Sequence, residues 1–410
     1  MPVVLYNVVG SPPCSFIRSL AKEIGIEITL KNIRLKNGDH LAEEFLKLNP
    51  FHRVPMMDDN GFVIYESNAI AFYLLRKYAP TCKLYPDCIK TRARIDQVLA
   101  AVSGNIHPNV ATFFRPRLLQ QSKPTTEEMN HFEQNVINGL EHLIGEAKFA
   151  VGDEYTIADL CLVGEVLVAL ENDSVDEKKF PKLTSYYERV KATLPYFEEI
   201  YAPNIDVIKR MWSQLNCRWS IQEENKKWNG AESETSSRPR SVNPFHKVPA
   251  IDDDGFVVYE SNAIAYYLLR KYAPESDLYP TCIKTRTRID QVLAAASSNI
   301  HPQLGAFFRP RYFQGTKPSS EEMKAFEENV LKNLENIVGD SKFAVGDKLT
   351  AADLCLIGHV TVGLECPCVD RVKYPKLSAY YERVKSVLPY YEEIFGPFTV
   401  QAKHLWEKLK

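Results

Sequence analysis

The hydrophobic and polar positions in the first eighty residues predict a small α/β domain. Apolar runs typical of strands alternate with segments of helical spacing, and an Asp-Asn-Gly turn at residues 59–61 separates the last two strands. The expected order is strand 2–9, helix 14–25, strand 28–35, hairpin 54–67 and helix 68–79. Together these elements indicate an α/β domain over residues 1–80.

After residue 88 the pattern becomes helical, with apolar residues recurring every three or four positions. The predicted helices span residues 89–106, 125–145, 156–171, 180–194 and 203–215. Thr156 is expected to cap the third of these helices, with Asp159 three residues on as its capping-box partner. We therefore expect an all-helical domain over residues 88–217.

Residues 49–212 are repeated in closely similar form from residue 243 onward. Asn49 corresponds to Asn243, Glu66 to Glu260 and Trp212 to Trp406, always with an offset of 194 residues and without insertion. A constant offset over so long a stretch indicates tandem duplication of one unit, not an array of small repeats. We call residues 1–217 the first copy and residues 243–410 the second copy.

The two copies differ at the front. Where the first copy has a strand, a helix and a strand, residues 218–242 are polar, charged and serine-rich, without strand alternation, and indicate a linker. The second copy should then consist of a partial α/β domain over 243–274, lacking its first strand-helix-strand, and an all-helical domain over 282–400. Thr350 and Asp353 repeat the capping box.

The composition narrows the functional classes. The chain has 410 residues, 45% of them apolar and 25% charged, and a net charge of −2 with basic residues spread along it. Such a chain is typical of a soluble protein of several domains that binds neither nucleic acid nor an anionic membrane. No apolar run approaches the ~20 residues of a membrane helix and no signal peptide is recognisable, so we expect a cytoplasmic location. The nine irregularly spaced cysteines are expected to be reduced.

The first candidate site is Gly-Ser-Pro-Pro-Cys at residues 10–14, where a strand ends and a helix begins. Ser11 and Cys14 thus lie near a helix N-terminus, where negative charge is favoured. Their spacing is that of the Cys-x-x-Cys motif of thioredoxin-like proteins, with serine in the leading position. Such a serine can donate a hydrogen bond to a substrate thiolate; the alternative is that it only caps the helix.

Two further positions in each copy are candidates for ligand binding. Val54-Pro55 and Val248-Pro249 begin a strand. A cis bond would turn the preceding backbone outward as a peptide-binding edge, whereas a trans edge-strand proline is the commoner alternative. Glu66 and Ser67 stand between a strand and a helix, where a hydroxyl and a backbone N–H can bind a carboxylate, or where Ser67 only caps the helix.

Other signals are weak. The chain has no Gly-rich phosphate loop, no His-Glu-x-x-His and no Gly-x-Ser-x-Gly. Cys366 and Cys368 form a Cys-Pro-Cys that only the second copy has, and without a second Cys/His pair nearby no metal site is expected. Phe113 and Phe114 are typical of a core and could also line a ligand pocket.

Taken together, residues 10–20 (GSPPCSFIRSL), 38–78 and 149–160 (FAVGDEYTIADL) resemble the soluble glutathione transferases. The resemblance is greatest to the arthropod delta and epsilon classes, which use a serine at this N-terminal position. It spans residues 1–217 and again 243 to about 400. It implies a thioredoxin-like domain that binds glutathione, and a helical domain that supplies the pocket for a small hydrophobic electrophile, as in detoxification.

The resemblance also implies roles for single residues. Ser11 would favour the glutathione thiolate, since a free thiol of pKa about 8.5 is only a few per cent ionised at pH 7. His40 and His52 would contact the glycyl end, and Val54, before the family's cis proline Pro55, would pair with the cysteinyl unit.

The remaining implied contacts concern the γ-glutamyl end and the second substrate. Glu66 would take the γ-glutamyl ammonium and Ser67 the carboxylate, while Asn68 would make a polar contact where the common insect pattern has arginine. The hydrophobic-substrate pocket is assigned to Phe113, Phe114, Arg117 and Trp212. No metal and no cofactor are expected besides glutathione as co-substrate.

The second copy retains part of this set, namely His246, Val248, Pro249, Glu260 and Ser261, and has no counterpart of Ser11, Cys14 or His40. We therefore expect conjugation in the first copy only, and an intramolecular pseudo-dimer or a homodimer. A joined product of two neighbouring genes is an alternative origin of the chain. The alternative function is a non-catalytic scaffold, as in translation elongation factor gamma subunits, or a carrier of hydrophobic ligands.

Overall fold

The computed structural model describes residues 3–172, 175, 177–215 and 243–409. The predicted linker, 218–242, lies outside the described residues. Contacts between Cα atoms divide the chain into two compact units, and each unit contains parts of both copies. Unit 1 comprises Met1–Asp39, Val54–Val63 and Leu74–Tyr272, and unit 2 comprises His40–Arg53, Ile64–Tyr73 and Ala273–Lys410. The domain boundaries stated above stay predictions.

The first copy begins with a four-stranded sheet in the order β2-β1-β3-β4. Its strands are β1 (Val3–Asn7), β2 (Ile28–Asn32), β3 (Met56–Asp59) and β4 (Phe62–Tyr65). β1 pairs in parallel with β2 and antiparallel with β3, so that Leu5 lies opposite both Leu30 and Met57. Helix α1 (Pro12–Glu23) joins β1 to β2. This mixed sheet confirms the predicted thioredoxin-like α/β domain.

The turn between β3 and β4 is the one that its sequence predicts. Asn60 and Gly61 both have positive φ, 54° and 83°, as a two-residue hairpin turn requires. The second copy repeats the geometry at Asp254 and Gly255, which join β5 (Ala250–Asp253) to β6 (Phe256–Tyr259). There the two strands form a two-stranded sheet in the described part of the chain.

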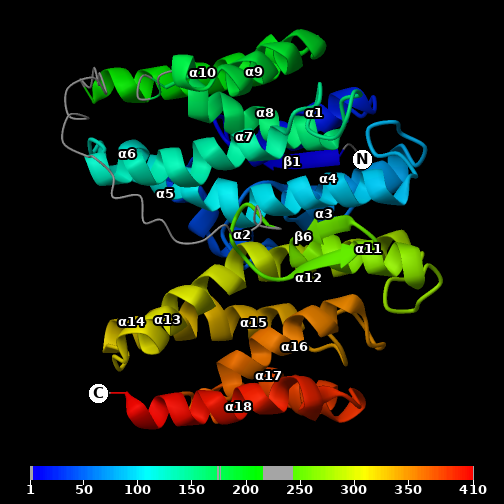
Figure 1. Ribbon diagram of the computed structural model, residues 1–410, viewed down its shortest axis with the longest axis vertical. Coiled ribbons are helices and arrows are strands. Elements are labelled where there is room, and N and C mark those ends of the chain that lie inside the picture. The colour runs from blue at the N-terminus through cyan, green and yellow to red at the C-terminus, as the bar shows by residue number, and fades with distance from the viewer. Residues whose placement is uncertain (1–2, 173–174, 176, 216–242, 410) are drawn as a thin grey trace. The chain divides into compact units, whose positions relative to one another are not determined.

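The helical domain of the first copy lies in unit 1. Its helices are α4 (Ile89–Ala101), η3 (Val102–Ile106), α5 (His107–Gln120), α6 (Thr126–Phe132), η4 (Glu133–Ile137), α7 (Asn138–Ile144), α8 (Ile157–Leu170), α9 (Pro181–Thr193) and α10 (Phe197–Gln214). Every residue of α8 is buried, and α1, α4, α5, α9 and α10 pack around it (Figure 1). Thr156 and Asp159 form the predicted capping box at its start.

Two of the helix predictions differ from the structure. The segment 107–120 was not predicted to be helical, yet it forms α5 with Pro116 inside. The predicted start of the last helix, Pro203, lies inside α10, which begins at Phe197. Because proline usually stands in the first turn of a helix, a helix with proline in its interior is not predicted or is predicted to start too late.

Unit 1 also includes the partial α/β domain of the second copy. Its helix α11 (Ser261–Tyr272) packs along α4 of the first copy (Figure 1). Val258, Ala263 and Tyr267 are fully buried in one cluster with Ala93 of α4. The apolar face that the shortened domain presents is therefore covered by a helix of the first copy.

Unit 2 contains the helical domain of the second copy. Its helices are α12 (Ile283–Ala295), η6 (Ala296–Ile300), α13 (His301–Gln314), α14 (Ser320–Phe326), η7 (Glu327–Leu331), α15 (Lys332–Val338), α16 (Ala351–Leu364), α17 (Pro375–Val387) and α18 (Tyr391–Lys408). Thr350 and Asp353 form the second predicted capping box. The short helices of the chain are η1 (Leu35–Asn37), η2 (Asp39–Leu41), α2 (Glu43–Leu48), η5 (Glu177–Lys179) and η8 (Arg371–Lys373).

Helix α3 (Ser67–Tyr78) of the first copy begins in unit 2. Just before it, the backbone N–H of Tyr65 donates to Oε1 of Gln291 on α12 at 3.1 Å. Unit 1 contains the equivalent bond, from the N–H of Tyr259 to Oε1 of Gln97 on α4, also at 3.1 Å. In each case a glutamine side chain of one copy accepts a hydrogen bond from the last strand residue of the other copy.

Candidate functional site

The residues predicted to bind glutathione are divided between the two units. Unit 1 contains Ser11, Val54 and Pro55, whereas unit 2 contains His40, His52, Glu66, Ser67 and Asn68. The geometry within each unit shows how the chain holds these side chains. Their roles toward a ligand stay predictions.

Ser11 is the N-cap of α1. Its backbone is extended, and its Oγ accepts a hydrogen bond from the N–H of Cys14 at 3.4 Å. Ser11 therefore does cap the helix, and this contact uses one lone pair of its Oγ as the acceptor. A hydroxyl oxygen that accepts a hydrogen bond still carries its own proton, so capping does not exclude donation by the same group.

The loop before Ser11 is fastened by Asn204 on α10, a residue that the sequence did not single out. Oδ1 of Asn204 accepts from the N–H of Gly10 at 2.8 Å, and its Nδ2 donates to Oγ of Ser15 at 2.8 Å. Gly10 has φ 91°, which disfavours other residues. The position equivalent to Asn204 in the second copy is Phe398, and that copy lacks the loop. The difference between the copies at this position accompanies the loss of the loop, but most neighbouring positions differ as well, so the sequence does not single Asn204 out.

Cys14 is fully buried, and burial raises the pKa of its thiol to about 11. The position near a helix N-terminus therefore does not make it a thiolate, because desolvation outweighs the hydrogen bond from Ser11. A buried neutral thiol is not suited to thiol-disulfide exchange. The role of Ser11 toward a ligand stays a prediction.

The Val54-Pro55 and Val248-Pro249 bonds are both cis, as the resemblance implied and against the commoner trans alternative. Val54 is half-buried in the first copy. Val248 is 93% exposed in the second copy, whose β5 has no counterpart of β1 beside it. The equivalent backbone thus has a different environment in the two copies.

In unit 2, His40 lies close enough to His52 to affect it. The pKa of His52 is lowered, first by desolvation and then by the neighbouring His40, so the neutral imidazole is favoured. His52 has φ 56° and lies in a turn that Asn49 holds, because Nδ2 of Asn49 donates to the carbonyl of Arg53 at 2.8 Å. Within the described part of the chain, Nδ1 of His40 is buried without a hydrogen-bond partner.

Glu66 holds the cap position of α3, not Ser67. Ser67 and Asn68 are the first two helical residues, and the N–H of Ile70 donates to the carbonyl of Glu66 at 3.0 Å. Glu66 has φ 70°, an unusual conformation for a residue other than glycine. The alternative that Ser67 is the helix cap is therefore wrong.

The carboxylate of Glu66 is bound by η6 of the second copy. Its Oε1 accepts from Nδ2 of Asn299 at 2.9 Å, and its Oε2 accepts from Oγ of Ser298 at 3.0 Å. In unit 1, Oε1 of Glu260 accepts from Nδ2 of Asn105 at 2.9 Å. These partners lie more than 150 residues away along the chain, and no local sequence signal identifies them.

The four residues assigned to the hydrophobic-substrate pocket are all core residues of unit 1. Phe113, Phe114, Arg117 and Trp212 are between 1% and 6% exposed. Phe113 stacks on Phe132 and approaches Trp212. Phe113 and Phe114 are thus core residues, which was one of the two alternatives that their sequence left open. The role of the four residues in a substrate pocket stays a prediction.

Arg117 is neutralised by a bidentate contact with Glu128 at 2.8 and 2.7 Å, and Arg311 by the same contact with Glu322. The hydrogen bonds from arginine hold the pKa of each glutamate at about 2. A folded-state pKa below the unfolded value stabilises the fold above about pH 4.5, and this contribution is lost as the pH falls toward 2.

We therefore expect Glu128→Gln to lower the free energy of unfolding by about 1 to 3 kcal/mol at pH 7, because a buried guanidinium loses its counter-charge. The effect should shrink between pH 4.5 and 2, where the parent also loses the charge. Urea unfolding at a series of pH values measures this. Glu127→Gln, at an exposed neighbour, is the control, and an effect of Glu128→Gln that is independent of pH would contradict the assignment.

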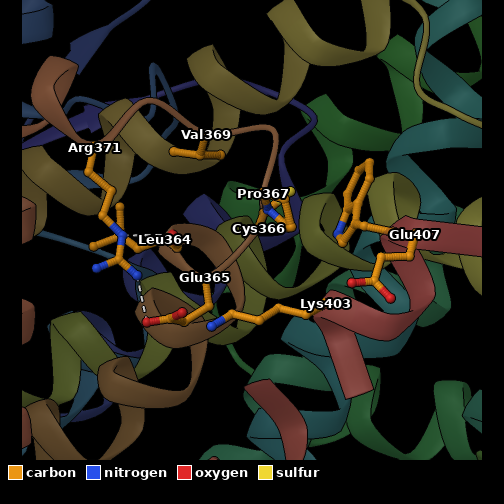
Figure 2. Close-up of a pocket in the computed structure, with 9 residues that line it drawn as sticks. Leu364, Glu365, Cys366, Pro367, Val369, Arg371, Lys403 and Glu407 are labelled. Atoms are coloured by element: carbon orange, nitrogen blue, oxygen red, sulfur yellow. Dashed lines mark hydrogen bonds and ion pairs between the residues drawn. The ribbon is translucent and has the colours of Figure 1, made fainter. Parts of the chain in front are cut away.

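A cavity of about 590 Å³ lies in unit 2 and contains none of the predicted site residues. Figure 2 shows Arg371 reaching toward Glu365, to which it donates at 2.5 Å, with Lys403 on the other side of Glu365. Trp406 also lines this cavity. Cys366 also lines this cavity and forms a disulfide with Cys368, so the expectation that all cysteines are reduced is wrong at this pair. The two cysteines are separated by a single proline, and the first copy does not have this motif.

Residues 3–172, 175, 177–215 and 243–409 are the described part of the chain. In these ranges no group of three or more His, Cys, Asp or Glu side chains is placed to hold a metal ion. Nor does any helix there combine the length and the apolar character needed to cross a membrane.

Comparison with known families gives two models that each match the chain twice. The model of the glutathione S-transferase N-terminal domain matches residues 1–76 and 209–270. The model of the glutathione S-transferase C-terminal domain matches residues 98–193 and 290–386. These matches account for both copies.

Several solved structures that are similar to this chain come from insects, and each covers about half of it. A delta-class glutathione transferase from Nilaparvata lugens is 31% identical over 52% of this chain and 100% of its own, with a TM-score of 0.47. An epsilon-class enzyme from the housefly Musca domestica is 28% identical over 53% and 100%, with a TM-score of 0.49. A homolog from Drosophila mojavensis, with bound glutathione, is 27% identical over 51% and 97%, with a TM-score of 0.47.

Proposed function

Because the chain belongs to the glutathione S-transferase family, we propose that its first copy conjugates glutathione to small hydrophobic electrophiles and that the second copy has no active site of its own. The observation that supports this most directly is the Ser11 loop. It places a hydroxyl at the N-terminus of α1, and Asn204 fastens it through Gly10. The described part of the second copy contains no equivalent loop.

In the proposed reaction, the Ser11 hydroxyl donates a hydrogen bond to the glutathione sulfur and stabilises its thiolate, and the thiol proton leaves to solvent. The thiolate attacks the electrophilic carbon, a C–S bond forms, and the leaving group departs with its electron pair. The N-terminal end of α1 also favours negative charge at this place. Catalysis then comes mainly from stabilising the nucleophile and positioning it.

The other residues of the first copy are proposed to bind the ends of the tripeptide. His40 and His52 would contact the glycyl end, Val54 and Pro55 the cysteinyl backbone. Glu66 would take the γ-glutamyl ammonium, and Ser67, at the start of α3, would bind the carboxylate, because N–H groups at a helix N-terminus favour an anion. Asn68 would make a further polar contact with this end.

The test is the steady-state rate of conjugation to a chloronitroaromatic acceptor, together with calorimetric titration of the intact chain with glutathione. We expect a rate above that of the uncatalysed reaction and one glutathione bound per chain. Two bound glutathiones would contradict a single site. Binding without turnover would instead support the scaffold or carrier alternative.

A further inference from the structure

The Cys-Pro-Cys motif of the second copy follows directly after α16, at the cavity of about 590 Å³ in unit 2 (Figure 2). Its two cysteines form a disulfide. Cys366 lines the cavity and is only 2% exposed, whereas Cys368 is half-buried. Cys368 is therefore the more accessible end of this disulfide.

The first copy closes the equivalent helix end without a disulfide. Asn172 stands there at the position of Cys366. Its Nδ2 donates to the carbonyls of Val168 and Ala169 at 2.8 and 2.7 Å, near the end of α8. An amide side chain at this position is thus sufficient to complete the helix end.

The disulfide encloses a very short loop, because Cys366 and Cys368 are two positions apart. A disulfide stabilises a fold mainly by restricting the unfolded chain, and this effect decreases as the loop becomes shorter. The Cα atoms are 5.4 Å apart, in the ordinary range for a disulfide, and one proline keeps the two cysteines neighbours when the bond is open. The fold therefore gains little from the closed bond, and the open pair can close again. Both properties suit thiol–disulfide exchange.

The charges beside this disulfide differ between the two copies. In the first copy, Lys209 forms an ion pair with Glu171 at 3.4 Å. In the second copy, the equivalent glutamate, Glu365, forms its ion pair with Arg371 at 2.5 Å. Lys403, the equivalent of Lys209, lines the cavity and forms no ion pair within the part of the chain that the structure describes, although its charge acts on Glu365.

The substitution that explains this difference is at Arg371, because the first copy has Glu177 at the same position. The other carboxylate of the cavity, Glu407, lies 3.7 Å from Nδ1 of His404. The cavity therefore presents the Lys403 ammonium beside a disulfide. Its volume is in the range of sites that bind small molecules. An ammonium group favours a carboxylate, and a disulfide reacts with a thiol.

We propose that Cys366 and Cys368 form a thiol–disulfide exchange site for a small thiol that carries a carboxylate, and that Lys403 binds this carboxylate. Glutathione is one thiol of this class. The site belongs to the second copy and does not depend on the function proposed for the first copy, so a chain without conjugating activity would retain it.

The exchange takes place in two balanced steps. The thiolate of the small thiol attacks the sulfur of Cys368 and forms a mixed disulfide, while Cys366 leaves with the electron pair of the S–S bond and takes up the proton that the small thiol lost. A second thiol molecule then attacks the mixed disulfide at the sulfur of the first molecule and leaves Cys368 as a thiol. Two small thiols are thereby oxidised to one disulfide, and the protein gains two electrons and two protons.

The first experiment measures how far the disulfide opens in the intact, folded chain at set ratios of reduced to oxidised glutathione. Alkylation followed by peptide mass spectrometry counts the free thiols at Cys366 and Cys368. We expect the pair to change reversibly from mostly closed to mostly open as the ratio rises from about 1:1 to about 1000:1. A pair that stays closed until the chain is unfolded would overturn the proposal, as would a pair that is open at every ratio.

The second experiment tests the carboxylate. The rates at which glutathione and the uncharged 2-mercaptoethanol open the disulfide are each divided by the rate for the same chain unfolded in urea, which removes differences in intrinsic thiol reactivity. The corrected rate should be about 5-fold higher for glutathione, and Lys403→Gln should remove this advantage without changing the rate for 2-mercaptoethanol. Lys209→Gln, at the equivalent position of the first copy, should change neither rate. Equal corrected rates in the parent, or equal slowing of both thiols by Lys403→Gln, would overturn the proposal.

Single variants identify the sulfur that is attacked. With oxidised glutathione, the half-buried Cys368 that remains in Cys366→Ser should form a mixed disulfide about 10-fold or more faster than the buried Cys366 that remains in Cys368→Ser. The fold tolerates serine at position 368, because the first copy has Ser174 there. A faster reaction at Cys366 would overturn the assignment of Cys368 as the attacked residue.

Discussion

Replacing Ser11 by alanine is expected to lower kcat/KM for glutathione conjugation by about 10- to 100-fold. A hydrogen bond to a charged group contributes about 1.5 to 3 kcal/mol, and each 1.4 kcal/mol corresponds to a factor of ten in rate. The pKa of the bound thiol should also return toward about 8.5, so the profile of rate against pH should shift to higher pH. Steady-state rates between pH 6 and 9 measure both effects.

The control for this change is Cys14→Ala on the same helix. Cys14 is buried and its thiol pKa is about 11, so its removal should leave the conjugation rate within about twofold. Ser11→Ala also removes a helix cap worth about 1 kcal/mol, which urea unfolding detects separately. The assignment fails if Ser11→Ala keeps the parent rate, or if Cys14→Ala loses it while remaining folded.

Asp159→Ala is expected to destabilise the protein by about 3 to 5 kcal/mol, the largest effect on stability that the structure indicates. The carboxylate is fully buried and accepts from the N–H groups of Ala150 and Thr156, at 2.9 and 2.8 Å, and from the hydroxyl of Tyr186 at 2.8 Å. Its removal leaves three donors unpaired, of which those of Thr156 and Tyr186 are buried and cost about 1 to 3 kcal/mol each, and relaxation recovers part of the sum. Urea unfolding of the intact chain measures the change.

The second copy offers a matched variant in Asp353→Ala. Asp353 accepts from Ala344, Thr350 and Tyr380 at 2.8, 2.7 and 3.0 Å, so a similar loss is expected for the transition that involves unit 2. Asp153→Ala, at an exposed position, should change stability by less than about 0.5 kcal/mol. A loss below about 1 kcal/mol for Asp159→Ala would show that the network is not needed.

Much of the fold follows from local chemistry that is visible in the sequence. The turn at Asn60 and Gly61 needs two residues that tolerate positive φ, and the capping boxes at Thr156 and Thr350 need a hydroxyl and a carboxylate three residues apart. These features are decided within a few residues. They were therefore predictable without knowledge of tertiary contacts.

The features that escaped prediction depend on distant partners or on competing signals. Asn204 approaches Gly10 from 194 residues away, and Asn299 approaches Glu66 from 233 residues away, so neither bond leaves a trace in local periodicity. Helix α5 was not predicted because it contains Pro116, and proline is unfavourable inside a helix since it has no N–H to donate. The helix forms in spite of this proline. The disulfide between Cys366 and Cys368 was not predicted, because cysteines of a cytoplasmic protein are usually reduced and the short spacing of this pair was given less weight.

The contact between Glu66 and Ser298 also has a consequence for how such a protein can change over generations. In a symmetric homodimer, every mutation at an interface occurs on both sides at once, because both subunits come from one gene sequence. In this chain the equivalent positions are encoded separately, and they already differ: Ser298 faces Glu66, whereas Gly104 faces Glu260. The second copy can therefore accumulate substitutions that alter its contacts with the first copy, which holds Ser11, without the same substitutions appearing in the first copy.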